Sequence, residues 1–254
     1  MALLNINNIK MNYHSLKGET EAIKDISFVV NDKDFLSILG PSGCGKSTLL
    51  NIISGLLKQS SGTVTYNNEP IRNNLDKIGY MFQKDHLFDW TSVWNNVILG
   101  LKIKGLLTDE NIARVEALLD NYDLTKFKDH KPTELSGGMR QKVALIRTLA
   151  LNPKILFLDE PFSALDYQTR LNVCDEIHQI IKLEGKTVIM VTHDIGEAIS
   201  TSNRIIVLSK RPSVIKREIE ISFKNDPLTP FNRRKESEFK NYFDLLWKEL
   251  DDSD

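Results

Sequence analysis

The stretch FLSILGPSGCGKSTLLNIISGLL, at residues 35–57, decides the fold of this chain. Its first five residues form a short apolar run that ends at a glycine-rich turn, which is typical of a buried strand. After the turn, Leu49, Ile53 and Leu56 recur at helical spacing between residues 46 and 57. The stretch therefore predicts a strand, a tight turn and a helix in direct succession.

The turn matches the phosphate-binding pattern G-x-x-x-x-G-K-[ST], supplied here by Gly40, Gly45, Lys46 and Ser47. Glycines allow successive backbone amides to face inward around a polyphosphate, and the dipole of the following helix adds to the attraction. We expect Lys46 to reach the β and γ phosphates and the Ser47 hydroxyl to hold Mg²⁺. An ordinary glycine turn before a helix is the alternative. The flanking strand and helix favour a nucleoside-triphosphate site.

The composition argues against several other classes of protein. The chain has 254 residues, enough for one large α/β domain or two small ones. Its 33 Lys+Arg and 34 Asp+Glu give a net charge of −1, and no basic patch indicates a nucleic-acid partner. No apolar run approaches a membrane span, and the N-terminal residues lack the features of a signal peptide. Two cysteines give no disulfide framework, so we expect a reducing, cytosolic location.

Apolar patterning predicts a nucleotide-binding core interrupted by helices. Short or alternating apolar runs predict strands before residue 84, at residues 4–6, 23–30, 63–66 and 78–82. Helical periodicity follows over residues 84–151, which we interpret as an insert. Continuous apolar runs, typical of buried parallel strands, lie at residues 155–158, 187–191 and 205–208, with a crossover helix at 168–183. We predict an α/β phosphate-loop NTPase core with a mostly parallel sheet, an N-terminal antiparallel β subdomain and a helical insert.

The end of the insert carries a second potential phosphate site in LSGGMRQ, residues 135–141. Ser136 is a suitable N-cap, and Gly137 and Gly138 leave the first amides of the next helix sterically open. Such a helix start can bind a phosphate. A capped helix with no ligand is the alternative.

An acidic pair follows the apolar run at residues 155–158. Because ligands bind at the carboxyl ends of strands in open α/β sheets, Asp159 and Glu160 are expected to face the nucleotide. Asp159 can hold Mg²⁺ through water, and Glu160 can accept a proton from an attacking water. His193 follows a strand at the same edge of the sheet. A solvated strand end and a structural histidine are the alternatives.

Together these motifs resemble the ATP-binding cassette (ABC) family, in order and over nearly the whole chain. Residues 40–48 match the Walker A loop, 135–141 the signature and 155–160 Walker B, while SALD at 163–166 looks like the D-loop. The resemblance implies catalytic roles for Glu160, His193 and Gln83, and metal binding by Ser47, Gln83 and Asp159. It implies nucleotide contacts from Tyr13, Gly40, Pro41, Ser42, Gly43, Cys44, Gly45, Lys46, Ser47, Thr48, Ser136, Gly137 and Gly138.

The resemblance also implies how these residues work. Two cassettes pair head to tail, and each ATP lies between the Walker A loop of one and Ser136 to Gly138 of the other. Tyr13 would stack on adenine. Gln83 would contact the metal and the attacking water, and His193 would touch the γ-phosphate and help to hold Glu160. The cofactors expected are ATP and Mg²⁺.

Within the family, the chain looks like the nitrate, sulfonate and taurine importer ATPases. That group implies a homodimer at the cytoplasmic face of the membrane, integral permease subunits as partners, and an external solute-binding protein that acts indirectly. A thiamine-precursor importer ATPase and a lone cassette with a regulatory role are the alternatives. Five residues depart from the usual pattern: Lys33 and Gln59 replace a glycine and a proline, Gly196 and Asn203 replace acidic residues, and Ser213 replaces a glycine.

Two outlying segments carry clustered aromatic residues. Between residues 84 and 94, Leu87, Phe88 and Trp90 are expected to line a groove for the permease. The alternative is that Phe88, Trp90 and Trp94 fill the core of the insert. Near the C-terminus, residues 236–250 place an apolar face on one helix, which we expect to pack on the body. We expect one ABC ATPase domain over residues 1–254, with its C-terminal helical extension at 232–254.

Overall fold

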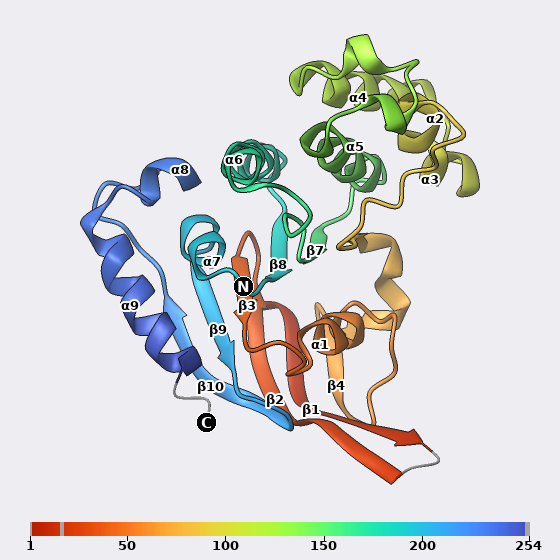
Figure 1. Ribbon diagram of the computed structural model, residues 1–254. Helices are drawn as coiled ribbons and strands as arrows, with labels where there is room; N and C mark the ends of the chain where they lie inside the picture. The colour runs from red at the N-terminus through yellow and green to blue at the C-terminus, as the bar shows by residue number, and fades with distance from the viewer. Residues whose placement is uncertain (1, 16–17, 252–254) are drawn as a thin grey trace.

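The computed structural model describes residues 2–15 and 18–251 (Figure 1). Its centre is a ten-stranded sheet in the order β5-β4-β1-β2-β10-β9-β3-β8-β7-β6. Neighbours from β9 to β6 run parallel. These parallel strands are β3 (Phe35–Leu39), β6 (Ile78–Met81), β7 (Ile155–Asp159), β8 (Thr187–Val191) and β9 (Arg204–Leu208).

The other half of the sheet is antiparallel and begins at the N-terminus. Its strands are β1 (Ala2–Ser15), β2 (Gly18–Asn31), β4 (Ser61–Tyr66) and β5 (Glu69–Pro70). The strand β10 (Ser213–Glu220) joins the halves, since it runs antiparallel to β9 and parallel to β2. The predicted fold class is confirmed, although the sequence analysis did not predict β10.

The parallel strands are apolar on both faces because helices cover both. Leu36 and Phe157 belong to the core cluster packed on α1 (Lys46–Ile53), whereas Leu156 and Met190 belong to the cluster of α5 (Gly137–Leu149) and α6 (Tyr167–Leu183). The prediction that α1 extends to residue 57 is wrong. The helix ends at Ile53, since Gly55 has a φ of 78°, which a continuing helix cannot include.

The insert stands beside the sheet at the upper right of Figure 1. Before α5 it comprises α2 (Val93–Val97), α3 (Leu99–Ile103) and α4 (Asp109–Asn121), with 3₁₀ turns at η2 (Thr125–Phe127) and η3 (Pro132–Glu134). Its first helix begins at Val93, where Ser92 accepts a hydrogen bond from the Asn95 amide. The expectation of helix from residue 84 is wrong for residues 84–92, which form loop and turn.

The remaining helices lie on the side of the sheet opposite α1. They are α7 (Ile195–Thr201), α8 (Pro230–Arg233) and α9 (Ser237–Asp251), and a 3₁₀ helix, η1 (Ile71–Lys77), precedes β6. Leu246 of α9 is fully buried in a cluster with α7 and β9, which confirms that the C-terminal apolar face packs on the body. Residues 252–254 of the expected extension lie outside the described residues. Within the described ranges, no helix combines the length and apolar character needed to cross a bilayer.

Candidate active site

The phosphate loop lies between β3 and α1 and encloses a pocket of about 230 Å³. Gly43 and Gly45 have φ angles of 76° and 114°, which residues with a side chain rarely adopt. The predicted loop residues that line the pocket are Ser42, Gly43, Gly45, Lys46, Ser47 and Thr48. Cys44 is buried, and a Cβ added to Gly40 would lie 2.8 Å from the Cys44 Sγ. The side chain of Cys44 therefore packs beneath the loop instead of facing the pocket.

Lys46 is held in position by the loop itself. Its Nζ donates to the carbonyl oxygens of Gly40 at 2.8 Å and Pro41 at 3.1 Å, and the residue is 6% exposed. An ammonium group has three protons, so one remains for an anion in the pocket. Taking a cation this far out of water has a cost that an anionic ligand would offset.

Asp159, the first carboxylate of the acidic pair, belongs to a hydrogen-bonded group of four residues, with Ser47, Tyr80 and Asn51. Asp159 Oδ1 accepts from Ser47 Oγ at 2.9 Å, and Oδ2 accepts from the Tyr80 hydroxyl at 3.3 Å. Tyr80 also donates to Asn51 Oδ1 at 2.9 Å. Burial raises the pKa of Asp159, against the lowering effect of Ser47 and Tyr80. Burial and the neighbouring carboxylate raise the pKa of Tyr80, which keeps it a donor.

This hydrogen-bonded group contains two side chains, Ser47 and Asp159, whose oxygens could bind Mg²⁺, and two is a usual number of protein ligands for this ion. Magnesium is usually bound through one or two side chains plus phosphate oxygens and water. Ser47 and Asp159 supply one hydroxyl and one carboxylate beside the phosphate loop. Nowhere in residues 2–15 and 18–251 do three His, Cys, Asp or Glu side chains gather as a metal site. The donor set therefore fits a metal that is shared with a nucleotide.

The second carboxylate, Glu160, has a left-handed φ of 45°, which is uncommon outside glycine. Its amide donates to the Val191 carbonyl oxygen at 2.9 Å, which fastens it to the end of β8. Glu160 Oε2 lies 3.1 Å from His193 Nδ1 and accepts from Gln83 Nε2 at 3.4 Å. Three predicted site residues from distant parts of the chain thus meet at one carboxylate.

Tyr13 also lies at the phosphate loop. Its hydroxyl is 3.1 Å from Thr48 Oγ1, and the residue is 40% exposed. The ring is thus open to solvent at the edge of the pocket.

Residues 136–138 form the start of α5 but do not line this pocket. The Ser136 hydroxyl accepts from the Met139 amide at 3.3 Å, which caps the helix. Ser136 and Gly137 are exposed, whereas a Cβ on Gly138 would meet Val173 at 2.7 Å. The structure therefore places this helix start apart from the phosphate loop of the same chain.

The sequence analysis missed three residues of the site. Tyr80 and Asn51 support Asp159, and Arg211 lines the phosphate pocket from the segment between β9 and β10. Burial raises the pKa of the Cys44 thiol, and the charges of Lys46 and Arg211 oppose it. Arg211 lies in the stretch LSKRPS, residues 208–213, for which the sequence predicted no role at the phosphates.

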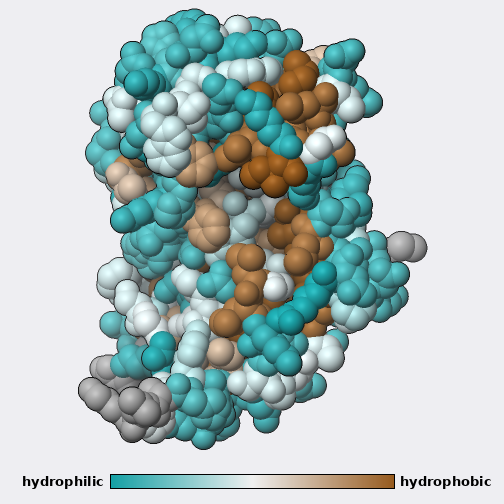
Figure 2. All heavy atoms as spheres, turned by 90° about the vertical axis from the view of Figure 1, so that its right-hand side faces the viewer, coloured by the Kyte–Doolittle hydropathy of each residue, from teal (hydrophilic) through white to brown (hydrophobic). Residues whose placement is uncertain are grey.

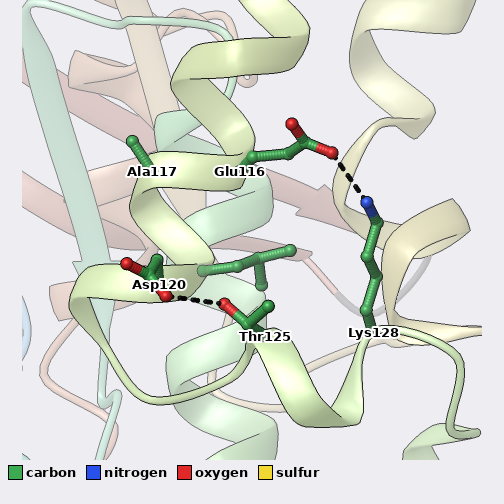
Figure 3. A pocket seen from close by; sticks show the side chains of 6 residues that line it. Glu116, Ala117, Asp120, Thr125 and Lys128 are labelled. Carbon is green, nitrogen blue, oxygen red and sulfur yellow. Dashed lines mark hydrogen bonds and ion pairs between the residues drawn. The ribbon is translucent and has the colours of Figure 1, made fainter.

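A larger hollow of about 360 Å³ lies in the insert (Figure 3). Its charged side chains are already paired: Lys128 contacts Glu116 at 2.7 Å, and Thr125 donates to Asp120 at 3.3 Å. It has no glycine-rich turn, and its cation Lys128 is already neutralised by Glu116. It therefore does not compete with the phosphate loop as a nucleotide site.

Comparisons with known proteins agree with this geometry. A family model described as ABC transporter matches residues 23–163. The chain is 45% identical to the ABC transporter ATP-binding protein YtlC of Bacillus subtilis (strain 168) over 98% of this chain and 96% of that protein. It is 39% identical to the taurine import ATP-binding protein TauB of Jannaschia sp. (strain CCS1), over 89% and 85% of the two chains. The nitrate import ATP-binding protein NrtD of Synechocystis sp. is 38% identical over 96% and 93%.

A solved structure supports the same assignment. It is a dimer of the ATP-binding cassette MJ0796 in a post-hydrolysis state bound to ADP and Pi. It superposes with a TM-score of 0.74 at 34% identity, over 87% of this chain and 99% of that one. The phosphate loop, the acidic pair and these relatives lead to one conclusion: the chain belongs to the ABC transporter family, as an ATP-hydrolysing subunit.

Proposed function

We propose that this ATPase energises import of a small solute of the nitrate, sulfonate or taurine type. The observation that carries the proposal is that importer ATPases named for nitrate and taurine align with the chain over 85% or more of their length. A thiamine-precursor importer and a cassette with a regulatory role outside transport are the alternatives. The solute itself would bind the permease and the external binding protein, so this chain does not select it.

The phosphate loop would bind the nucleotide, with Lys46 at the β and γ phosphates and Tyr13 against the adenine. Ser47, Asp159 and Gln83 would hold Mg²⁺, which neutralises charge on the phosphoryl oxygens when bound. Tyr80 and Asn51 keep the Asp159 carboxylate oriented toward Ser47. Arg211 would add a second positive charge at the phosphates.

Glu160 is the residue we assign to the attacking water. A general base must lie within hydrogen-bond reach of the proton that it accepts, and Glu160 lines the phosphate pocket. His193 and Gln83, in contact with its carboxylate, would keep that group facing the pocket. His193 would also touch the γ-phosphate.

We further propose that the complete site forms between two copies of the chain. The exposed helix start at Ser136 lies outside the phosphate pocket of its own chain, so its free amides are available to a second one. The related cassette MJ0796 is dimeric in a post-hydrolysis state bound to ADP and Pi, which supports the proposal. ATP would then hold the two chains together, and hydrolysis would release them.

A groove beside the site suits the permease. A pocket of about 320 Å³ lies where the insert meets β6, and its lining includes Tyr80, Phe88, Leu99 and Ile103. Figure 2 shows apolar side chains gathered around a hollow on this side of the molecule. Trp90, 76% exposed, lies against Phe88 with 4.6 Å between ring centroids. Exposed apolar surface of this kind commonly marks a docking site.

The expectation that Leu87 lines this groove is wrong. Leu87 is 7% exposed and belongs to the core of the insert. Trp94 is packed against the same core, as the alternative had it. The loop is held by α5, since Arg147 donates to the carbonyl oxygens of Asp85 and His86 at 2.6 and 2.7 Å. Phe88 and Trp90 therefore remain as the proposed permease contacts, which would place the chain at the cytoplasmic face of the membrane.

The test is uptake by a strain that lacks this chain, measured for nitrate, taurine, an alkanesulfonate and a thiamine precursor. We expect uptake of one of these solutes to fall to background and to return with the parent chain. The double substitution Phe88→Ala and Trp90→Ala should restore neither uptake nor co-purification of the permease, while its ATPase activity stays near normal. Trp247→Ala, at a tryptophan that is also exposed and stacked on a phenylalanine, is the control. Unchanged uptake of every solute would favour the regulatory alternative.

A further inference from the structure

A pocket of about 190 Å³ lies at the end of the parallel strands opposite the phosphate loop. Phe35, the first residue of β3, lines it, while the phosphate loop follows the last residue of the same strand. Five residues of extended chain span roughly 16 Å, so the two pockets are separate. The basic residues in its lining are Lys33, His178, Lys182, Lys186 and Arg233.

The pocket is strongly basic although the chain as a whole is nearly neutral. None of the described residues that line it is an aspartate or a glutamate. Of the carboxylates around the pocket, Asp226 pairs with Arg233 at 3.1 Å and Asp34 pairs with Arg204 at 2.5 Å. Asp175, which acts on His178, has no cationic partner within the described residues and accepts from the Phe231 amide at 2.9 Å. In the described part of the chain, the side-chain ammonium groups of Lys33 and Lys182 have no ion pair or hydrogen bond. Two cations therefore lie at the pocket without a counter-charge.

A histidine is buried among these cations. His178 is 9% exposed, and its ring lies 5.5 Å from that of Phe35. Burial, then Arg233 and Lys182, lower the pKa of His178 to about 4, against weaker opposing effects of Asp175 and of a hydrogen bond to the Thr201 backbone. The imidazole is thus neutral near pH 7. A bound anion would favour its protonation and raise this pKa.

The pocket joins two parts of the fold. Lys33 and Lys186 precede the central strands β3 and β8, whereas Leu228 and Arg233 belong to the segment that leads to α9. Apolar groups, including Phe35 and Leu228, line part of the pocket, and a less polar surrounding strengthens attraction between opposite charges. Two of the departures noted in the sequence fall here: Lys33 stands for a glycine and Asn203 for an acidic residue.

We propose that this pocket binds a small oxyanion, a phosphate or sulfate group, that links the C-terminal segment to the nucleotide-binding core. Lys33 and Lys182 contact the anion through their ammonium groups, and His178 faces it from the buried side. Lys186, whose Nζ donates to Asn152 Oδ1 at 2.7 Å, adds positive charge to the lining. The site is independent of the transported solute. It goes beyond the proposed import function and does not rest on it.

The experiment follows the five histidine side chains by NMR while sodium sulfate is added to the full chain, with sodium chloride of equal ionic strength as reference. His178→Gln identifies the His178 signal, and His193 reports anions at the phosphate loop. We expect sulfate to raise the pKa of His178 by about 1 unit or more, as a charge within a few ångströms does. Titrations with inorganic phosphate and with glycerol phosphate distinguish a free anion from a phosphate group on a larger molecule.

Variants separate this site from a general effect of charge. Lys33→Gln with Lys182→Gln should weaken sulfate binding at His178 about tenfold or more, which is the loss of roughly 1.4 kcal/mol, and should leave the response of His193 intact. Lys24→Gln with Lys240→Gln, at exposed lysines elsewhere, makes the same change in net charge and should alter neither response. A His178 signal unmoved at anion concentrations that perturb His193 would overturn the proposal. Equal weakening in both double variants would overturn it too.

Discussion

Tyr80→Phe tests the hydrogen-bonded group behind the proposed metal site. The substitution keeps the ring and removes the hydroxyl that donates to Asn51 at 2.9 Å and to Asp159 at 3.3 Å. One proton serves both acceptors, so about one hydrogen bond is lost, and no cavity forms. A bond of this kind, partly directed at a charged group, contributes about 1–2 kcal/mol to the free energy of unfolding.

The assay is urea unfolding, in which we expect a lower midpoint with an unchanged slope. Asp159 also loses the donor that orients it, so ATPase activity should require a severalfold higher Mg²⁺ concentration. Tyr66→Phe is the control, since the Tyr66 hydroxyl makes no hydrogen bond within the described residues. Unchanged stability together with an unchanged Mg²⁺ requirement would refute the role given to Tyr80.

Three further substitutions test the site and its surroundings. Lys46→Ala should sharply weaken ATP binding in a titration without unfolding the protein, and unchanged affinity would contradict the assignment. Glu160→Gln should lower turnover by about 10²–10⁴ and trap an ATP-bound dimer in gel filtration, with Glu220→Gln as an exposed control. Burial raises the pKa of Glu197 from 4.5 to about 7, so the folded state keeps a proton that the unfolded state loses, and stability falls as pH rises across that window. The free energy of unfolding of Glu197→Gln should therefore exceed that of the parent by about 2–3 kcal/mol above pH 7 and equal it at pH 4.5. Parallel profiles of unfolding free energy against pH for the two proteins would contradict this prediction.

The central elements could be predicted because their sequence signals are local. The apolar run at residues 155–158 falls within β7, and the phosphate-loop pattern by itself requires glycines at the turn that joins β3 to α1. Covering helices make both faces of these strands apolar, so the pattern is continuous and easily read.

What the sequence did not reveal depends on contacts between distant residues. The strand β10 carries charged residues such as Lys216 and Glu218, which hide the apolar signal of a strand. Besides its neighbour β9 it also pairs with β2, almost 200 residues earlier in the chain. In the sequence, nothing distinguishes Tyr80 from other strand residues. Its role depends on the fold, which places its hydroxyl beside Asp159. Leu87 and Phe88 are neighbours, and no periodicity showed that one fills the core while the other lines a groove.

The central claim is that ATP is hydrolysed at a site shared by two copies of the chain. The most direct measurement is the ATPase rate of Lys46→Ala and Ser136→Arg chains, each alone and then mixed. Each variant alone disables both sites of its dimer, whereas a mixed dimer retains one site with an intact Lys46 and an intact Ser136. The account predicts that activity returns on mixing and rises with protein concentration. A mixture as inactive as its components, or a parent rate per chain that is unchanged on dilution to monomer, would contradict it.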